Sequence, residues 1–100
     1  MLPKNIAAYK IAKQLIRSAG SVAANYRASK RAKSTADFIN KIEMALEEAD
    51  ESHYWLTVIK DAEILNTDLL EELITEANEL TAIFAATDKT AKQNRNKSDI

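Results

Sequence analysis

The sequence predicts an all-α fold, an up-and-down antiparallel bundle of three helices. Gly and Pro each occur once in 100 residues, so the turn chemistry of β-sandwiches and barrels is absent and long helices are favoured. Hydrophobic residues make up 46% of the chain and recur at helical spacing. A chain of this length builds one domain with a single modest core. We therefore expect one helical bundle domain over residues 1–88.

The first helix is expected over residues 3–31. Pro3 suits its first turn, where a missing N–H leaves no hydrogen bond unmade. Gly20 lies in a run of small residues, and we interpret it as allowing a neighbouring backbone to come close. One face of this helix carries the apolar residues Ala8, Ile11, Ala12, Leu15, Ala19, Val22, Ala23 and Tyr26.

The second helix is expected over residues 34–62. Ser34, followed by Asp37 three residues later, is a variant of the capping box that begins helices. The core stripe of this helix consists of Phe38, Ile42, Ala45, Ala49, Leu56 and Ile59. A second apolar face carries Met44, Tyr54, Trp55 and Val58, which one three-helix core cannot bury. We predict that this second face is an oligomer interface.

The third helix is expected over residues 67–86, with Asn66 or Thr67 as its N-cap. Its inner face carries Leu70, Leu73, Ile74, Ala77, Leu80 and Phe84, and an acidic ridge lies outside. Residues 89–100 are polar and unpatterned, and we predict that they form a disordered tail. The connections are short, so neighbouring helices should be antiparallel.

Charge is segregated along the chain. Residues 1–36 hold eight basic residues and no acidic one, whereas residues 37–88 hold two basic and fourteen acidic residues. The basic residues that could track the phosphates of RNA or DNA are Lys10, Lys13, Arg17, Arg27, Lys30 and Arg31. The alternative is a solvated outer face that also pairs with the acidic helices. Both interpretations stay open.

The residues do not favour an enzyme. His53 follows Asp50 and Glu47 at a spacing that suggests a di-iron bundle, but such a site needs two histidines and four carboxylates. The carboxylates at positions 47–51 more often pair with cations on an adjacent helix, here Arg17 or Arg27. The chain has no nucleophile arrangement and no phosphate loop. We expect no catalytic site, no metal, no cofactor and no small-molecule substrate.

The sequence is that of a cytoplasmic protein. It has no cysteine for disulfides or thiolate metal sites, and its first residues lack the features of a signal peptide. No apolar stretch approaches the roughly 18 residues of a membrane span. We therefore expect no membrane association.

Three segments carry a resemblance to a known family. They are residues 14–28 (QLIRSAGSVAANYRA), 31–41 (RAKSTADFINK) and 47–56 (EEADESHYWL). Over about residues 3–60 the chain closely resembles the four-helix bundle proteins encoded within intervening sequences of bacterial 23S ribosomal RNA genes. The resemblance implies an up-and-down helical bundle that assembles as a homopentamer, with no known enzymatic activity and no settled function.

Two further expectations come from this resemblance. Related accessory proteins of diversity-generating retroelements bind nucleic acid through a basic surface, which favours the basic face of the first helix. Family members usually carry an additional amphipathic helix before the segment that resembles residues 2–6. Three helices here would then resemble a four-helix bundle that lacks its first helix, and subunit contacts would cover the exposed core. We therefore expect a homo-oligomer that acts by self-association or as a scaffold.

Overall fold

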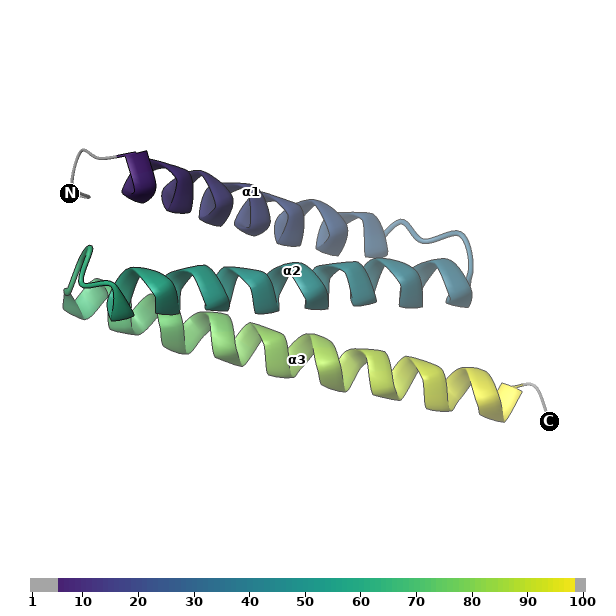
Figure 1. Ribbon diagram of the computed structural model, residues 1–100. Helices are drawn as coiled ribbons and strands as arrows, with labels where there is room; N and C mark the ends of the chain where they lie inside the picture. Colours follow the sequence, from purple (N-terminus) through teal and green to yellow (C-terminus); the bar gives the residue numbers. More distant parts are fainter. Residues whose placement is uncertain (1–5, 99–100) are drawn as a thin grey trace.

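A computed structural model describes residues 6–98 and contains three helices, α1 (Ile6–Ser29), α2 (Thr35–Asp61) and α3 (Asp68–Ser98). The helices lie side by side with α2 in the middle, and consecutive helices run in opposite directions (Figure 1). The predicted all-α, up-and-down architecture is confirmed. Residues 3–5, where the first helix was expected to begin, lie outside the described residues.

Local capping explains where α2 and α3 begin. The Ser34 hydroxyl accepts a hydrogen bond from the Asp37 amide at 3.0 Å, and the Asp37 carboxylate accepts one from the Lys33 amide at 3.2 Å. The Thr67 hydroxyl accepts from the Leu70 amide at 3.1 Å, so Thr67 is the cap of α3. Both predicted starts are thereby confirmed to within a residue.

The core follows α2 because this helix has a neighbour on each side. Seven of its residues are buried, and Ile42 is only 2% exposed. One buried cluster combines Ile42, Ala45 and Ala49 with Phe84 of α3. A second combines Leu56 and Ile59 with Leu70 and Ala77, and Ile11 and Leu15 of α1 pack against it. The predicted stripe of α2 is therefore the centre of the core.

The two outer helices do not close on each other. No Cα atom of α1 lies within 8 Å of a Cα atom of α3 among the described residues, although each helix packs against α2. The rings of Tyr26 and Phe84, 6.0 Å apart, are a side-chain contact between the two outer helices. The molecule measures 56 × 20 × 15 Å, which is an elongated layer of three helices. One side of the core is consequently open.

Helix α3 is longer than the sequence pattern predicted. It continues to Ser98, so residues 89–98 are helical and not a disordered tail, while residues 99–100 lie outside the described residues. Lys92 forms ion pairs with Asp88 of its own helix and with Glu43 of α2. Ion pairs thus hold the polar extension of α3 against α2. The spacing of apolar residues does not reveal such ion pairs.

The interpretation of Gly20 is wrong. Gly20 is exposed, and a Cβ atom added there would meet nothing within 4 Å. The helices instead approach at Ser18 and Ser52, which are both buried and whose hydroxyl oxygens lie 3.0 Å apart. The close approach of α1 to α2 therefore depends on two small hydroxyl residues, Ser18, two positions before the glycine, and Ser52 of α2.

The length and hydrophobicity of the helices indicate whether they could cross a membrane. Within residues 6–98, no helix combines the length and the apolar character that crossing a bilayer requires.

Candidate functional site

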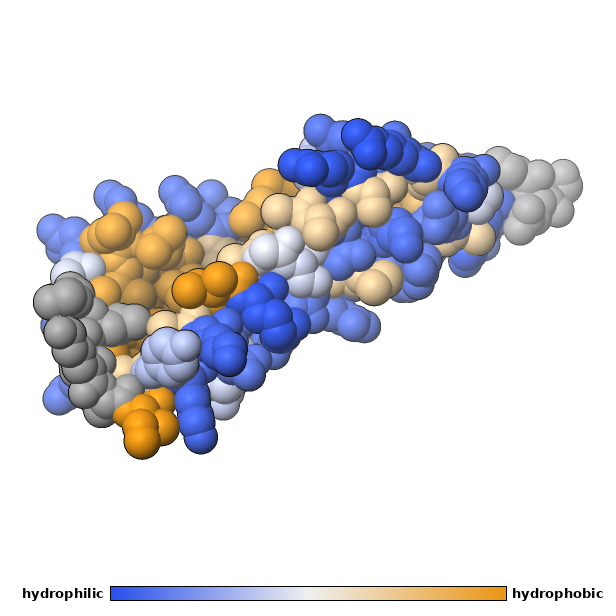
Figure 2. All heavy atoms as spheres, turned by 90° about the horizontal axis from the view of Figure 1, so that it is seen from above, coloured by the Kyte–Doolittle hydropathy of each residue, from blue (hydrophilic) through white to orange (hydrophobic). Residues whose placement is uncertain are grey.

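The open side of the core forms a groove between α1 and α3, with α2 as its floor. The groove has a volume of about 330 Å³, and one of its lining residues, Glu76, is charged. Figure 2 shows hydrophobic residues gathered on the half of the molecule nearer the start of α1, with mostly hydrophilic residues towards the end of α3. The lining residues are Leu15, Ala19, Val22, Ala49, Ser52, Leu56, Leu73, Glu76, Ala77 and Leu80.

Two residues of this groove correct the expected inner face of α3. Leu70, Ala77 and Phe84 are buried as predicted, whereas Leu73 and Leu80 are 40% and 43% exposed. They point into the groove, where no helix covers them. The spacing of apolar residues marks the face of a helix but does not report whether another helix lies against it. An exposed core was expected, but the sequence pattern did not place it between α1 and α3.

The second apolar face of α2 lies outside the groove. Of the four residues expected at an oligomer interface, Met44 and Tyr54 are exposed, and Trp55 and Val58 are half-buried. The rings of Tyr54 and Trp55 lie 5.0 Å apart in an edge-to-face arrangement. We call Met44, Tyr54, Trp55 and Val58 the aromatic patch. It presents rigid apolar surface of the kind that anchors protein interfaces.

Arg17 links α1 to α2 beside this patch. Its guanidinium donates hydrogen bonds to Glu51 and, at 3.1 Å, to Glu48. The bond from Arg17 lowers the pKa of the Glu51 carboxyl below its ordinary value, and the same pairing raises the pKa of Arg17. The Trp55 indole N–H also donates to Glu51, at 3.4 Å. The predicted pairing of these carboxylates with a cation of the first helix is thus confirmed for Arg17.

The basic residues of α1 and of the turn that follows it have different surroundings in the structure. Arg17 is committed to α2, and the Lys30 ammonium lies 4.7 Å from the centre of the Tyr26 ring, a cation–π contact. Among the described residues, the other four side chains of the set form no ion pair and are exposed; they are Lys10, Lys13, Arg27 and Arg31. Within the predicted set, Arg17 therefore faces α2, and the other residues lie at the surface without an ion pair in the described part of the chain.

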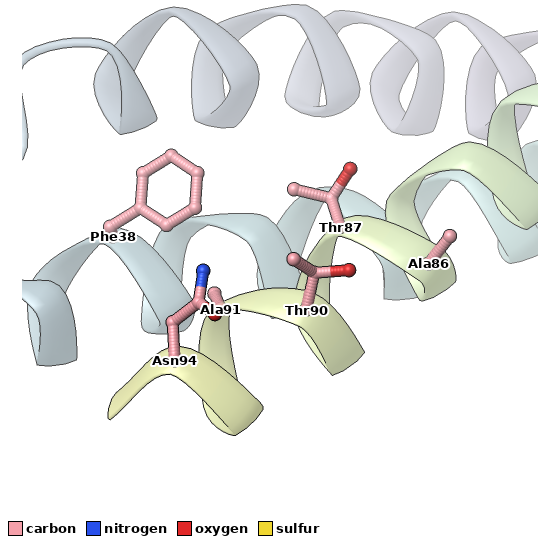
Figure 3. Close-up of a pocket in the computed structure, with 6 residues that line it drawn as sticks. All are labelled: Phe38, Ala86, Thr87, Thr90, Ala91 and Asn94. Carbon is pink, nitrogen blue, oxygen red and sulfur yellow. The ribbon is translucent and has the colours of Figure 1, made fainter. Parts of the chain in front are cut away.

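A second hollow, of about 410 Å³, lies where the start of α2 meets the C-terminal half of α3. Figure 3 shows Phe38 from α2 beside a row of small and polar residues from α3. Its lining contains no ionisable group, so it offers no acid or base for catalysis. The residues are Phe38, Ala86, Thr87, Thr90, Ala91 and Asn94.

His53, the candidate for a metal site, is half-buried on α2, and its carbonyl accepts a hydrogen bond from the Thr57 hydroxyl at 2.9 Å. Within residues 6–98, no group of three or more His, Cys, Asp or Glu side chains is placed to hold a metal ion. The spacing of His53 from Asp50 and Glu47 is therefore not completed by a third element of the fold.

Comparison with known proteins gives two similarities. The family model of 23S rRNA-intervening sequence proteins matches residues 1–86. The structure is similar to a 1.70 Å crystal structure of a protein with unknown function from the S23 ribosomal protein family of Bacteroides thetaiotaomicron VPI-5482. That similarity has a TM-score of 0.75 at 35% sequence identity, and it covers 79% of this chain and 73% of the other. A search of curated proteins finds no match.

Proposed function

The chain belongs to the 23S rRNA-intervening sequence protein family, and we propose that it acts by self-association, as an oligomeric helical scaffold without enzymatic activity. The observation that carries this proposal is the uncovered core. The apolar groove and the aromatic patch lie on different sides of α2, and each leaves large apolar side chains in contact with water. Contiguous exposed apolar surface of this kind marks association sites on soluble proteins.

The aromatic patch is the first surface we propose for association. Tyr54 is 57% exposed and is held against the Trp55 ring, so little side-chain freedom remains to be lost when a partner covers it. Glu51 and Arg17 supply a polar rim on the same side of the molecule. An apolar centre with a charged rim is the usual composition of a protein interface.

Sedimentation velocity at micromolar concentration tests the proposal directly. We expect a mass of several chains, and Tyr54→Lys should lower that mass because it introduces a charge into the patch. Asn78→Lys, which adds the same charge at an exposed position of α3, should leave the mass unchanged. A monomer at every concentration tested would overturn the proposal.

The number of copies is a further part of the proposal. The family resemblance favours a homopentamer, and we place the assembly in the cytoplasm. The cysteine-free, highly charged composition supports that location. Sedimentation equilibrium, which is independent of shape, would distinguish five copies from two or four.

The basic face of α1 supports a second candidate function, the binding of RNA or DNA. Helix α1 contains no acidic residue, and Lys10, Lys13, Arg27 and Arg31 are exposed. Such a surface would contact phosphates, so binding should be weak in sequence preference and strongly dependent on salt. Arg17 contributes less than the sequence pattern indicated, because α2 holds it.

A titration of short RNA and DNA at two salt concentrations tests this candidate. We expect binding that weakens steeply with salt and a shallower salt dependence for Arg31→Ala. Lys89→Ala, at an exposed position of α3, serves as the matched control. Absence of binding at the lower salt concentration would eliminate the nucleic-acid function and leave self-association unaffected.

A further inference from the structure

Two helices of the chain carry exposed apolar stripes that the fold leaves uncovered. The first, which we call the outer stripe of α1, consists of Ile6, Tyr9, Lys13, Ile16 and Gly20, and its apolar members are among the most exposed large residues of the protein. The second, the groove stripe of α3, consists of Leu69, Leu73, Glu76, Leu80 and Ile83. Neither stripe is covered by the helices of its own chain.

The two stripes have matching patterns when they are read in opposite directions. From Ile6 to Gly20 the steps are three, four, three and four residues, and from Ile83 back to Leu69 they are the same. Steps of three and four residues keep side chains on one seam of a helix, as in coiled coils. Two antiparallel helices with these seams therefore place apolar residues opposite each other on both sides of the central residue of each stripe.

The charged members of the two stripes also coincide. In this antiparallel register, the central residue of one stripe is Lys13 and that of the other is Glu76. Glu76 is the charged residue among those that line the groove, and it forms no ion pair within residues 6–98. Lys13 is likewise exposed and unpaired in that part of the chain. A Lys13 side chain from another molecule that entered the groove would neutralise the charge of Glu76.

The geometry of the groove agrees with this direction of approach. Its walls, α1 and α3, run parallel to each other (Figure 1), so a helix antiparallel to both would continue the up-and-down pattern. Ile16 is 73% exposed and does not line the groove of its own chain. The outer stripe of α1 therefore cannot fill this groove within one molecule and must come from a second copy.

We propose that α1 of a second copy docks antiparallel into the groove between α1 and α3, with its Lys13 paired to Glu76 and its Ile16 and Tyr9 set against Leu73 and Leu80. This inference rests on the proposed self-association and specifies one of its interfaces. The contact joins two different surfaces, so each copy offers a free groove and a free outer stripe. The assembly therefore grows beyond a dimer and forms a ring or a filament.

Charge reversal tests the pair. Lys13→Glu and Glu76→Lys should each weaken self-association by about tenfold or more in sedimentation velocity, because like charges then meet in an apolar groove. An equimolar mixture of the two variants should assemble further than either variant alone, since each variant then meets a complementary charge on the other. The double variant K13E/E76K should by itself regain the mass of the unmodified protein.

The controls are Lys10→Glu on α1 and Asp50→Lys on α2, which change charge at exposed positions outside both stripes. Circular dichroism should show the same helix content and thermal unfolding for every variant. If the unmodified protein assembles but the two stripe variants behave like the controls, or if the double variant does not regain the mass, the interface is wrong while self-association stands. A monomeric unmodified protein would overturn both.

Discussion

Helices α2 and α3 have similar apolar patterns in the sequence but different surroundings in the fold. Helix α2 lies between two neighbours, and seven of its residues are buried. Among the described residues, the backbone of helix α3 comes close to α2 alone, and three of its six predicted core residues, Leu70, Ala77 and Phe84, are buried. The apolar stripe of α3 is thus shared between a core and an open groove. A helix at the edge of a layer keeps part of its apolar face for association.

Ile42→Ala should have the largest effect, because it removes apolar atoms at the centre of the better-covered helix. Ile42 is 2% exposed, and cavities at such sites cost about 2–5 kcal/mol of unfolding free energy. Leu80→Ala, on the edge helix, should cost less at low protein concentration, since Leu80 is partly in water already. Denaturant unfolding of both variants measures the difference, and equal losses would contradict the contrast between the two helices.

Ser18→Leu should have the next largest effect, since it enlarges a residue at the closest approach of α1 to α2. Ser18 is fully buried against Ser52, and overpacking of this kind costs about 1–3 kcal/mol. The same measurement on Ala24→Leu, an exposed position of α1, provides the matched control. An unchanged free energy of unfolding for Ser18→Leu would mean that α1 can move away from α2 without a loss of stability.

Gly20→Ala should stabilise the protein at low concentration, where the outer stripe of α1 is uncovered. Gly20 lies inside α1 with open space around it, and replacing a glycine in a helix interior by alanine gains about 0.5–1 kcal/mol. The expected result is a higher melting temperature with unchanged helix content. A loss of stability would indicate that a neighbouring molecule lies against this position, and its dependence on protein concentration would then be measured.

Arg17→Met should have the smallest effect at neutral pH, because its ion pairs with Glu48 and Glu51 are solvent-exposed. The pKa of Glu51 is lowered in the folded protein, mainly by the hydrogen bond from Arg17. A lowered folded pKa contributes stability that is present above the unfolded pKa and is lost as the pH falls through the folded pKa.

The unmodified protein should therefore lose more stability on acidification than Arg17→Met does. Denaturant unfolding at neutral pH and at pH values below the ordinary pKa of a Glu side chain, about 4.3, measures the two losses. Arg27→Met controls for removal of an exposed charge from the same helix. Parallel pH profiles for the two variants would rule out a role for this pair in acid stability.

Much of the fold could be predicted, because its determinants are local. Ser34 with Asp37, and Thr67, are caps whose chemistry depends on residues three positions away. The predicted core stripe of α2 was correct because α1 and α3 cover that helix from two sides. The end of α3 was not predictable in this way, since Lys92 pairs with Glu43, which lies far away in the sequence. The interpretation of Gly20 failed because a small residue does not indicate which side of its helix faces a neighbour.

The candidate site likewise has features that the sequence predicted and features that it did not. The aromatic patch was recognised from Met44, Tyr54, Trp55 and Val58, because four apolar residues on the wrong face of a helix are visible in its period. The position of the exposed core was not predicted, since Leu73 and Leu80 belong to the same period as the buried residues of α3. The pairing of Arg17 with Glu48 and Glu51 was one of two alternatives in the sequence, and the fold decided it because these partners lie on α2.

The sequence by itself determined that this protein is three antiparallel helices, where α2 and α3 begin and which faces are apolar. These properties follow from hydrogen bonds and periodicities that span a few residues. Only the tertiary structure decided that the helices form a layer with α2 inside, and so which apolar residues remain in water. That outcome depends on which pairs of helices pack together, and among the described residues no Cα atom of α1 lies within 8 Å of a Cα atom of α3.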